Sequence, residues 1–464
     1  MSTKANPKVG VKTATKSAAK KMPAKKAAPK KSPTHLNLYA YQVGFGDCFL
    51  LQFVYGDDGS EKRHVLIDFG TTGTKEADSG ALMLRIAEDI RDKCNGSPLD
   101  VVVATHRHAD HISGFATKTS GKGSGDVIRS LQPKRVLQPW TEDLALATDA
   151  TGPRSLHAGA RSIKAVSALQ EMNSMAEQVA KLATAKPKSL PFGLADRLDF
   201  LGRDNTKNVS AVENLAAMGK GVSSVYAYFG LEDPLKDLLP GVKTYVLGPP
   251  TVEQYPAIQK QRSTDDDEFW QFHARGVAAA NTISDVEGGP FDAAFVFAKK
   301  GKLPREARWS AKHVTNARGN QLLGIVTMLD KAMNNTSLIL LLEVGGKRLL
   351  FPGDAQIENW SYALAQPKIA EMLADVDLYK VGHHGSLNAT PKSLWKAFKK
   401  RGTQAKRDRM TSVLSTMAGK HGSMEKKTEV PRRTLVEELK HDTHFHSTQE
   451  LLGNELFQVV RIDF

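Results

Sequence analysis

The alternation of apolar and polar segments along the chain predicts an α/β protein. Apolar strands open the folded part within residues 36–43, 48–53 and 64–67, and glycine-containing turns separate them. Residues 81–94 then carry apolar side chains at helical spacing, and an apolar strand over 99–104 follows. Strands that alternate with helices are typical of sheets covered by layers of helices.

The second half of the chain repeats this pattern. Strands over 336–344 and 347–351 form a predicted hairpin, because only a Gly-Gly pair separates them. A helix is predicted over 358–373 and a strand over 376–381. The last predicted elements are helices over 391–399 and 433–440 and strands over 411–415 and 458–462.

Two segments interrupt the strand–helix pattern. Residues 141–240 are rich in alanine and helical in character, with an amphipathic helix predicted over 208–218. Residues 255–325 are irregular in pattern. We interpret 141–240 and 255–325 as insertions in one domain that spans 35–464. The helices of the first insertion could form a lid or a wall of a substrate site.

Residues 1–34 form a basic tail of low complexity. The tail consists mainly of Lys, Ala, Pro, Thr and Ser, so it cannot bury enough apolar surface to offset the entropy of ordering and is predicted to be disordered. The chain carries a formal net charge of +14, and much of the excess lies near its start. Phosphate neutralisation would make the tail a salt-sensitive, non-specific nucleic-acid arm. The alternatives are a solubilising extension or an address signal.

Composition also bears on the compartment. No apolar run approaches the length that spans a bilayer, and the N-terminus lacks the apolar stretch of a secretory signal. Cys48 and Cys94 are the two cysteines in the sequence, so no disulfide framework is expected. These features predict a cytoplasmic protein without membrane insertion.

A histidine-rich motif follows the strand over 99–104. Alternate residues of extended backbone point the same way, so His106 and His108 can bind one metal ion. Asp110 and His111 come next, where the chain turns, and can reach a second ion beside the first. Imidazole nitrogen together with carboxylate oxygen suits zinc, manganese and iron, and such sites leave room for water.

The second half supplies further candidate ligands at the same architectural position. Asp354 and the pair His383-His384 follow the ends of apolar strands. A carboxylate can bridge two cations, and one more imidazole would complete the shell of one ion. The pattern favours His384 as that ligand, with His383 contacting the scissile group or donating a proton. Two ions about 4 Å apart can share a hydroxide and stabilise a displacement at phosphorus.

The motif His-x-His-x-Asp-His after a hydrophobic strand resembles the signature of the metallo-β-lactamase fold. The resemblance implies an αββα sandwich, here with helical insertions. It also implies that Asp68, in the Asp-Phe-Gly turn after the third strand, braces the metal loop through hydrogen bonds rather than binding metal.

Within that superfamily the chain most resembles the soluble metallo-hydrolase domain of DNA-internalisation competence proteins. The resemblance covers residues 36–140 and 241–464, outside the insertions. It rests on the motifs at 334–337 (Asn-Asn-Thr-Ser), 351–354 (Phe-Pro-Gly-Asp) and 378–386 (Leu-Tyr-Lys-Val-Gly-His-His-Gly-Ser). The membrane channel of the competence proteins is absent here, so the resemblance does not imply DNA uptake.

The sequence departs from many metallo-β-lactamase enzymes in one respect. Those enzymes place another metal-binding histidine between the first motif and the bridging aspartate. In this interval the chain has histidines outside any recognisable motif, and Asn335 or Ser337 is expected to take that place instead. The histidines are His157, His273 and His313.

Two further polar clusters are interpreted as surface features. His441, His444 and His446 follow a predicted helix, where exposed histidines are common. The acidic run at 265–268 is expected to face water, as contiguous carboxylates usually do.

These features together predict a metal-dependent phosphodiesterase or nuclease in which metal-activated hydroxide attacks phosphorus. Two Zn²⁺ ions are expected, with Mn²⁺ as an alternative, and nucleic acid is the expected partner through the basic tail. Asp110 and His383 are the predicted catalytic residues. The alternatives are a hydrolase of a small ester or phosphoester, such as a phosphorylcholine ester, and a regulatory protein that binds metal without turnover. The predicted metal ligands are His106, His108, Asp110, His111, Asp354 and His384.

Overall fold

The N-terminal strands and the chain's last strand form one sheet. In the part of the chain that the computed structural model describes, this sheet has seven strands in the order β13-β1-β2-β3-β4-β5-β6. Neighbours from β13 to β3 are antiparallel, and those from β3 to β6 are parallel. The strands are β1 (Pro33–Tyr41), β2 (Cys48–Tyr55), β3 (Glu61–Phe69), β4 (Val101–Val103), β5 (Arg135–Pro139), β6 (Ser224–Ala227) and β13 (Phe457–Asp463). The described residues are 32–56, 58–76, 78–143, 152–154, 208–220, 224–256, 333–386, 388, 390–422, 424, 429–453 and 455–464.

The second half of the chain forms the other sheet. Within the described ranges it has six strands in the order β12-β11-β10-β9-β8-β7. The strands are β7 (Lys243–Gly248), β8 (Ile339–Val344), β9 (Lys347–Phe351), β10 (Leu378–Lys380), β11 (Thr411–Leu414) and β12 (His444–Ser447). β7, β8 and β9 are antiparallel neighbours, whereas β9 to β12 run parallel. Each sheet therefore combines a meander with a parallel half, and both lie in the compact unit Lys31–Phe464.

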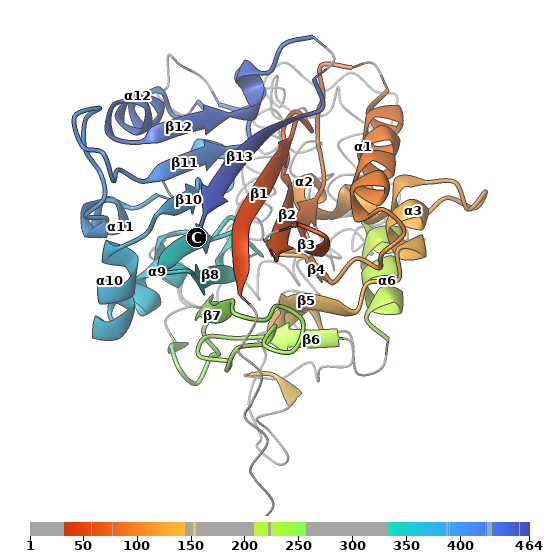
Figure 1. Ribbon diagram of the computed structural model, residues 1–464, viewed down its shortest axis with the longest axis horizontal. Coiled ribbons are helices and arrows are strands. Elements are labelled where there is room, and N and C mark those ends of the chain that lie inside the picture. The colour runs from red at the N-terminus through yellow and green to blue at the C-terminus, as the bar shows by residue number, and fades with distance from the viewer. Residues whose placement is uncertain are drawn as a thin grey trace, which may run out of the picture. The chain divides into compact units, whose positions relative to one another are not determined.

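Apolar side chains on both faces of each sheet produce four layers. In β2, Phe49 and Leu51 belong to the core between the sheets, whereas Cys48 and Leu50 pack against helices on the outer face. This division follows from the two-residue period of a strand. Figure 1 shows α1 and α6 beside the first sheet and α10, α11 and α12 beside the second. Strands that carry apolar residues on both faces thus fold into an αββα sandwich.

The helical layers are made from helices of 6 to 16 residues. On the first sheet lie α1 (Ser79–Cys94), α3 (Ser124–Ser130) and α6 (Val209–Met218). On the second lie α9 (Ile357–Leu364), α10 (Pro367–Ala374), α11 (Lys392–Ala397) and α12 (Arg433–Asp442). The connections contain α2 (Ala109–Ile112) and the single turns η1 (Ser113–Phe115), η2 (Trp140–Glu142), η7 (His383–Gly385) and η8 (Thr448–Glu450).

Three boundaries in the structure differ from those predicted from the sequence. Pro33 and Thr34, assigned to the tail, lie in β1, because Pro33 pairs with Tyr55 and the Phe464 N–H donates to the Thr34 carbonyl. β6 falls within the predicted insertion 141–240, yet it forms the edge of the first sheet beside β5. The predicted helix 358–373 is two helices, because proline begins the second and cannot donate a backbone hydrogen bond.

Several predictions fall on residues that the structure does not describe. They are the tail residues 1–31, most of both insertions and the acidic run at 265–268. Cys48 and Cys94 are both buried and free. Among the described residues, no helix has the length and apolar character that crossing a membrane requires.

Candidate metal centre

The histidine motif begins just past the carboxyl end of β4, an inner strand of the first sheet. His106 and His108 are separated by one residue on backbone that has not yet turned into a helix, since His108 has φ −61° and ψ 150°. Their rings therefore meet, and Nε2 of His106 lies 2.9 Å from Nδ1 of His108. Both side chains are buried. A cation placed between these nitrogens would be bound by both.

The next two candidates lie on α2, the single turn of helix that follows. Gly70 packs against this helix so closely that an added Cβ would lie 2.4 Å from the backbone nitrogen of His111. The backbone N–H of Asp47 also donates to the Asp110 carbonyl at 2.9 Å. These contacts hold Asp110 and His111 beside the two preceding histidines.

The second sheet contributes from the ends of β9 and β10. Asp354 follows β9, and the backbone N–H of His383 donates to its Oδ1 at 3.0 Å. His383 and His384 have φ values of 43° and 51°, a left-handed conformation that is uncommon outside glycine. Such conformations cluster at functional sites, where the surrounding structure enforces them. In this backbone conformation the His384 side chain is buried, whereas the His383 side chain is about a quarter exposed.

The six predicted ligands lie in two adjacent clusters. Within each cluster the candidate ligand atoms lie within 4.8 Å of one another. Asp110 belongs to both clusters, so it joins them. The first comprises His106, His108 and Asp110, and the second comprises Asp110, His111, Asp354 and His384. His383 is in neither cluster, although its Nε2 lies 3.9 Å from Oδ2 of Asp354.

Asp68 lies behind the centre, where the resemblance predicts a bracing residue. Its carboxylate accepts hydrogen bonds from the backbone N–H and the hydroxyl of Thr105, both at 2.7 Å. Its Oδ2 also lies 2.8 Å from Nδ1 of His111. That contact fixes the His111 ring, so Nε2 faces the cluster. On the other side, Nδ1 of His384 lies 3.1 Å from the Ser415 carbonyl and orients the second ring in the same way.

The electrostatics differ between the two clusters. Burial lowers the pKa of His106 well below its usual value and that of His108 to about 4, so both imidazoles are neutral at pH 7 with lone pairs available. Burial also lowers the pKa of His111 and His384, but nearby carboxylates, Asp354 first, outweigh it and raise the pKa of both, so each would release a proton on binding a cation. Burial opposes ionisation of Asp110 and Asp354, but nearby imidazoles, His111 first, outweigh it and lower the pKa of both carboxyl groups.

The residues present fit one or two divalent cations. Oδ1 of Asp110 is buried and has no hydrogen-bond partner among the described residues. An ionised carboxylate oxygen without a donor is costly to bury, and a cation would compensate it. The donor set of imidazole nitrogen and carboxylate oxygen suits zinc, manganese or iron.

Three residues near the centre were not predicted from the sequence. Asp47 and Lys380 are buried behind the ligands and form an ion pair. The signal for Lys380 was a lysine inside an apolar strand that ends at the His383-His384 turn. His421 lies in the loop after β11, and the Phe45 ring is 4.3 Å from both the His421 and His384 rings.

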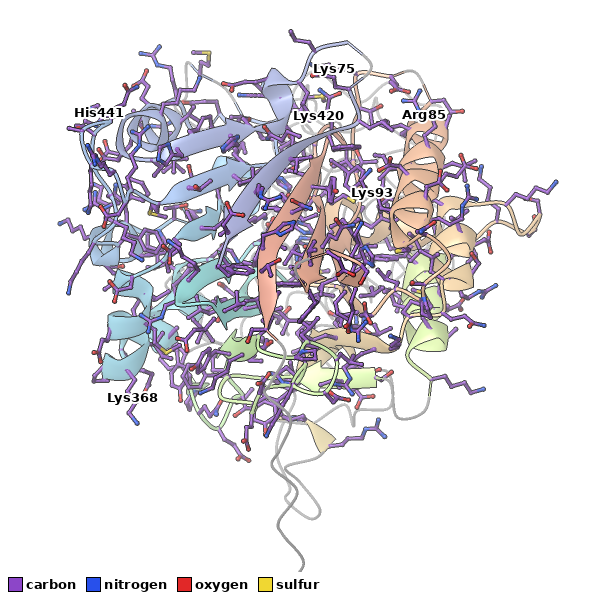
Figure 2. All side chains as sticks on the ribbon, in the orientation of Figure 1. Lys75, Arg85, Lys93, Lys368, Lys420 and His441 are labelled. Carbon is purple, nitrogen blue, oxygen red and sulfur yellow. The ribbon has the colours of Figure 1, made fainter. Side chains whose placement is uncertain are left out.

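Lys420, beside His421, lies over the turn that follows β3. Its side chain would be 2.7 Å from a Cβ added to Gly73. Figure 2 shows Lys420 and Lys75 at the same end of the unit.

The side chains of the other described candidates make contacts outside the two sets of ligand atoms. Asn335 donates to Glu358 at 3.0 Å, and Ser337 accepts from the Asp354 backbone N–H at 3.3 Å. His444 and His446 lie on the edge strand β12, and His441 is exposed at the rim of the view in Figure 2. His157, His273 and His313 lie outside the described residues.

Comparison with known proteins supports the same fold. The family model of the Metallo-beta-lactamase superfamily matches residues 41–117, from the end of β1 through the histidine motif. No curated protein matches the chain. The match, the two sheets and the His/Asp clusters together point to a metal-dependent hydrolase with a metallo-β-lactamase-type αββα fold.

Proposed function

We propose that the protein is a metal-dependent phosphodiesterase that acts on a nucleic acid or another phosphodiester. The observation that carries the proposal is the pair of adjacent His/Asp clusters joined by Asp110. Two neighbouring cations suit an in-line displacement at phosphorus, because they stabilise both the attacking and the leaving oxygen. Zn²⁺ is the proposed ion, with Mn²⁺ as the alternative.

The ligands of this chain would divide the cations between the clusters. His106 and His108 would hold one ion, and His111 and His384 would hold the other. Asp110, which belongs to both clusters, and Asp354, which belongs to the second, would supply the carboxylate oxygens. Bound divalent ions would supply Lewis acidity and an activated water near neutral pH.

Asp110 and His383 are proposed to handle protons. Oδ2 of Asp110 lies 2.8 Å from Nε2 of His384, and Oδ1 has no partner in the described part of the chain. With one of these oxygens bound to a cation, the other would accept the proton of the attacking water. His383 is partly exposed beside the clusters, and its Nδ1 lies 2.9 Å from the Ser386 hydroxyl. That contact orients the ring, so Nε2 can donate to the phosphate or to the leaving oxygen.

A polyanionic substrate is supported by charge and by resemblance. The net charge of +14 favours binding of nucleic acid. The motifs at 334–337, 351–354 and 378–386 resemble the hydrolase domain of DNA-internalisation competence proteins. Net charge and motif similarity bear on the substrate class, whereas the chemistry depends on the metal centre.

Activity screening tests the proposal. Purified full-length protein, with Zn²⁺ or Mn²⁺ added, would be given bis-p-nitrophenyl phosphate, single-stranded and duplex DNA, RNA and carboxylic esters. We expect turnover of phosphodiesters, lost on chelation, with His441→Ala as an active control. Ester turnover without phosphodiester turnover would replace the proposal with a small-ester hydrolase. Retention of metal without any turnover would replace it with a metal-binding regulatory protein.

A further inference from the structure

A buried lysine lies directly behind the metal centre, and the proposed chemistry does not use it. Lys380 is the last residue of β10 and is 3% exposed. Its ammonium contacts the carboxylate of Asp47, which is fully buried. Lysine is almost never fully buried unless it is paired, because desolvating the charge is costly. The burial of this ion pair beside the candidate ligands therefore suggests a role in the metal centre.

The pair contacts the ligands on the sides that face away from the clusters. Oδ1 of Asp47 lies 3.6 Å from Nδ1 of His384, and Oδ2 lies 3.7 Å from Nδ1 of His111. Asp47 thus lies between the rear nitrogens of two candidate ligands from different sheets. Its partner Lys380 also donates to the Gly353 carbonyl at 3.3 Å, next to a third candidate ligand.

The lysine approaches one particular oxygen of Asp354. Lys380 Nζ lies 3.7 Å from Oδ1, the oxygen that accepts the His383 backbone N–H at 3.0 Å. The other oxygen, Oδ2, faces the cluster and lies 3.1 Å from Nε2 of His111. Both contacts to Oδ1 oppose rotation of the carboxylate, so they keep Oδ2 directed toward the place of the cations.

We propose that Lys380, held by Asp47, is a positioning residue that fixes the Asp354 carboxylate for metal binding. This inference rests on the proposed metal centre. It concerns the affinity of the centre for metal rather than the substrate.

The sign of the effect distinguishes positioning from simple charge. An ammonium group close to the centre repels cations, so removing an ammonium that acted only as a charge would tighten metal binding. Removing a group that orients a ligand weakens metal binding, typically by about 10- to 100-fold for groups that support metal ligands. The two roles therefore predict opposite changes.

The test is equilibrium dialysis of Zn²⁺, and separately of Mn²⁺, against full-length Lys380→Met protein. We expect binding weaker than wild type by at least about tenfold. The matched control is Lys400→Met, which breaks the 2.9 Å pair between Lys400 and Asp377, just before β10, and should leave the affinity unchanged. Unchanged or tighter binding by Lys380→Met would overturn the inference.

The double variant Asp47→Asn with Lys380→Met separates positioning from loss of stability. It leaves no unpaired buried charge, so its resistance to urea should exceed that of Lys380→Met alone. Its metal binding should stay weak, because Asp354 still lacks the lysine. If the double variant binds metal as wild type does, the weakness of the single variant came from the unpaired Asp47, and the inference is wrong. If Lys380→Met does not fold, the double variant provides the same measurement.

The outcomes also separate this inference from the proposed function. Wild-type protein that binds no metal would overturn both. Wild-type protein that binds metal, with Lys380→Met equal to it, would overturn the positioning role alone and leave the proposed function standing.

Discussion

His108 and Asp354 are the two candidate ligands whose roles are easiest to separate by substitution. His108 belongs only to the cluster with His106, whereas Asp354 belongs only to the cluster with His111 and His384. Both side chains are buried, so neither can attract metal ions as an exposed surface charge. The chemistry of each residue is therefore testable through the metal that it retains.

We expect His108→Ala and Asp354→Ala each to lose bound metal together with activity, because each removes a proposed ligand from a buried site. Metal content is measured by elemental analysis of folded protein, with His441→Ala as an exposed histidine control. Full occupancy in both variants would show that the ligand assignment is wrong.

His64 offers a test of stability away from the metal ligands. It is buried in β3, and its Nε2 lies 3.1 Å from the Gln52 side-chain nitrogen. Burial lowers the pKa of His64 to about 4, against 6.5 for an exposed imidazole. The unfolded chain therefore takes up the proton first, so the stability from neutral His64 is present above pH 6.5 and is lost as the pH falls toward 4.

We expect His64→Gln to remove that part of the pH dependence. The shift corresponds to roughly 3 kcal/mol of unfolding free energy between pH 6.5 and 4. Urea unfolding of metal-free wild type and variant across this range measures it. An identical decline in both proteins would mean that His64 does not titrate as stated.

At the scale of elements, the centre depends on how closely β3 and α2 approach. α2 is one turn long, so its own hydrogen bonds cannot fix the direction of Asp110 and His111. Instead Gly70, just after β3, packs against the backbone of α2. A Cβ added to Gly70 would also lie 2.5 Å from the Ala109 carbonyl oxygen. The geometry of the ligands is thus set by a neighbouring strand end.

We expect Gly70→Ala to displace α2 and to weaken metal binding by at least about tenfold, with overpacking costing about 1–3 kcal/mol of stability. Gly80→Ala is the matched control, since Gly80 lies in the first turn of α1 and its nearest neighbour is a side-chain oxygen at 3.2 Å. Dialysis against Zn²⁺ and urea unfolding measure the two effects. Wild-type metal binding by Gly70→Ala would refute this account of α2.

At the scale of the whole molecule, the basic tail and the hydrolase domain are proposed to contribute separately. Thr34 belongs to β1 and its carbonyl accepts the Phe464 N–H, so the separable segment is shorter than the predicted 1–34. Deletion of residues 1–31 leaves that strand intact. It removes much of the positive charge near the start of the chain.

We expect this deletion to leave turnover of small substrates unchanged and to weaken nucleic-acid binding. The dependence of affinity on salt should also flatten, because fewer counterions are released on association. Titrations of both proteins at several salt concentrations measure this. Identical affinities and slopes would show that the tail is not a nucleic-acid arm.

The sequence by itself determined the local features of this protein. The succession of apolar strands and helices predicted an α/β fold, and the resemblance carried by the histidine motif after β4 implied the sandwich. The motif also marked the strand end at which candidate ligands gather. Both signals follow the order of residues along the chain, so they are readable without knowledge of the fold. Asp354 and His384 were found in the same way, because each directly follows an apolar strand.

The tertiary structure alone decided which residues from distant segments meet. Asp47 and Lys380 are 333 positions apart by their numbers, and their pairing arises because β2 and β10 come from different sheets that pack face to face. The approach of Gly70 to α2, and of Phe45 to His421, also depends on the packing of separate strand ends. Local periodicity carries no information about such distances, because packing between sheets sets them.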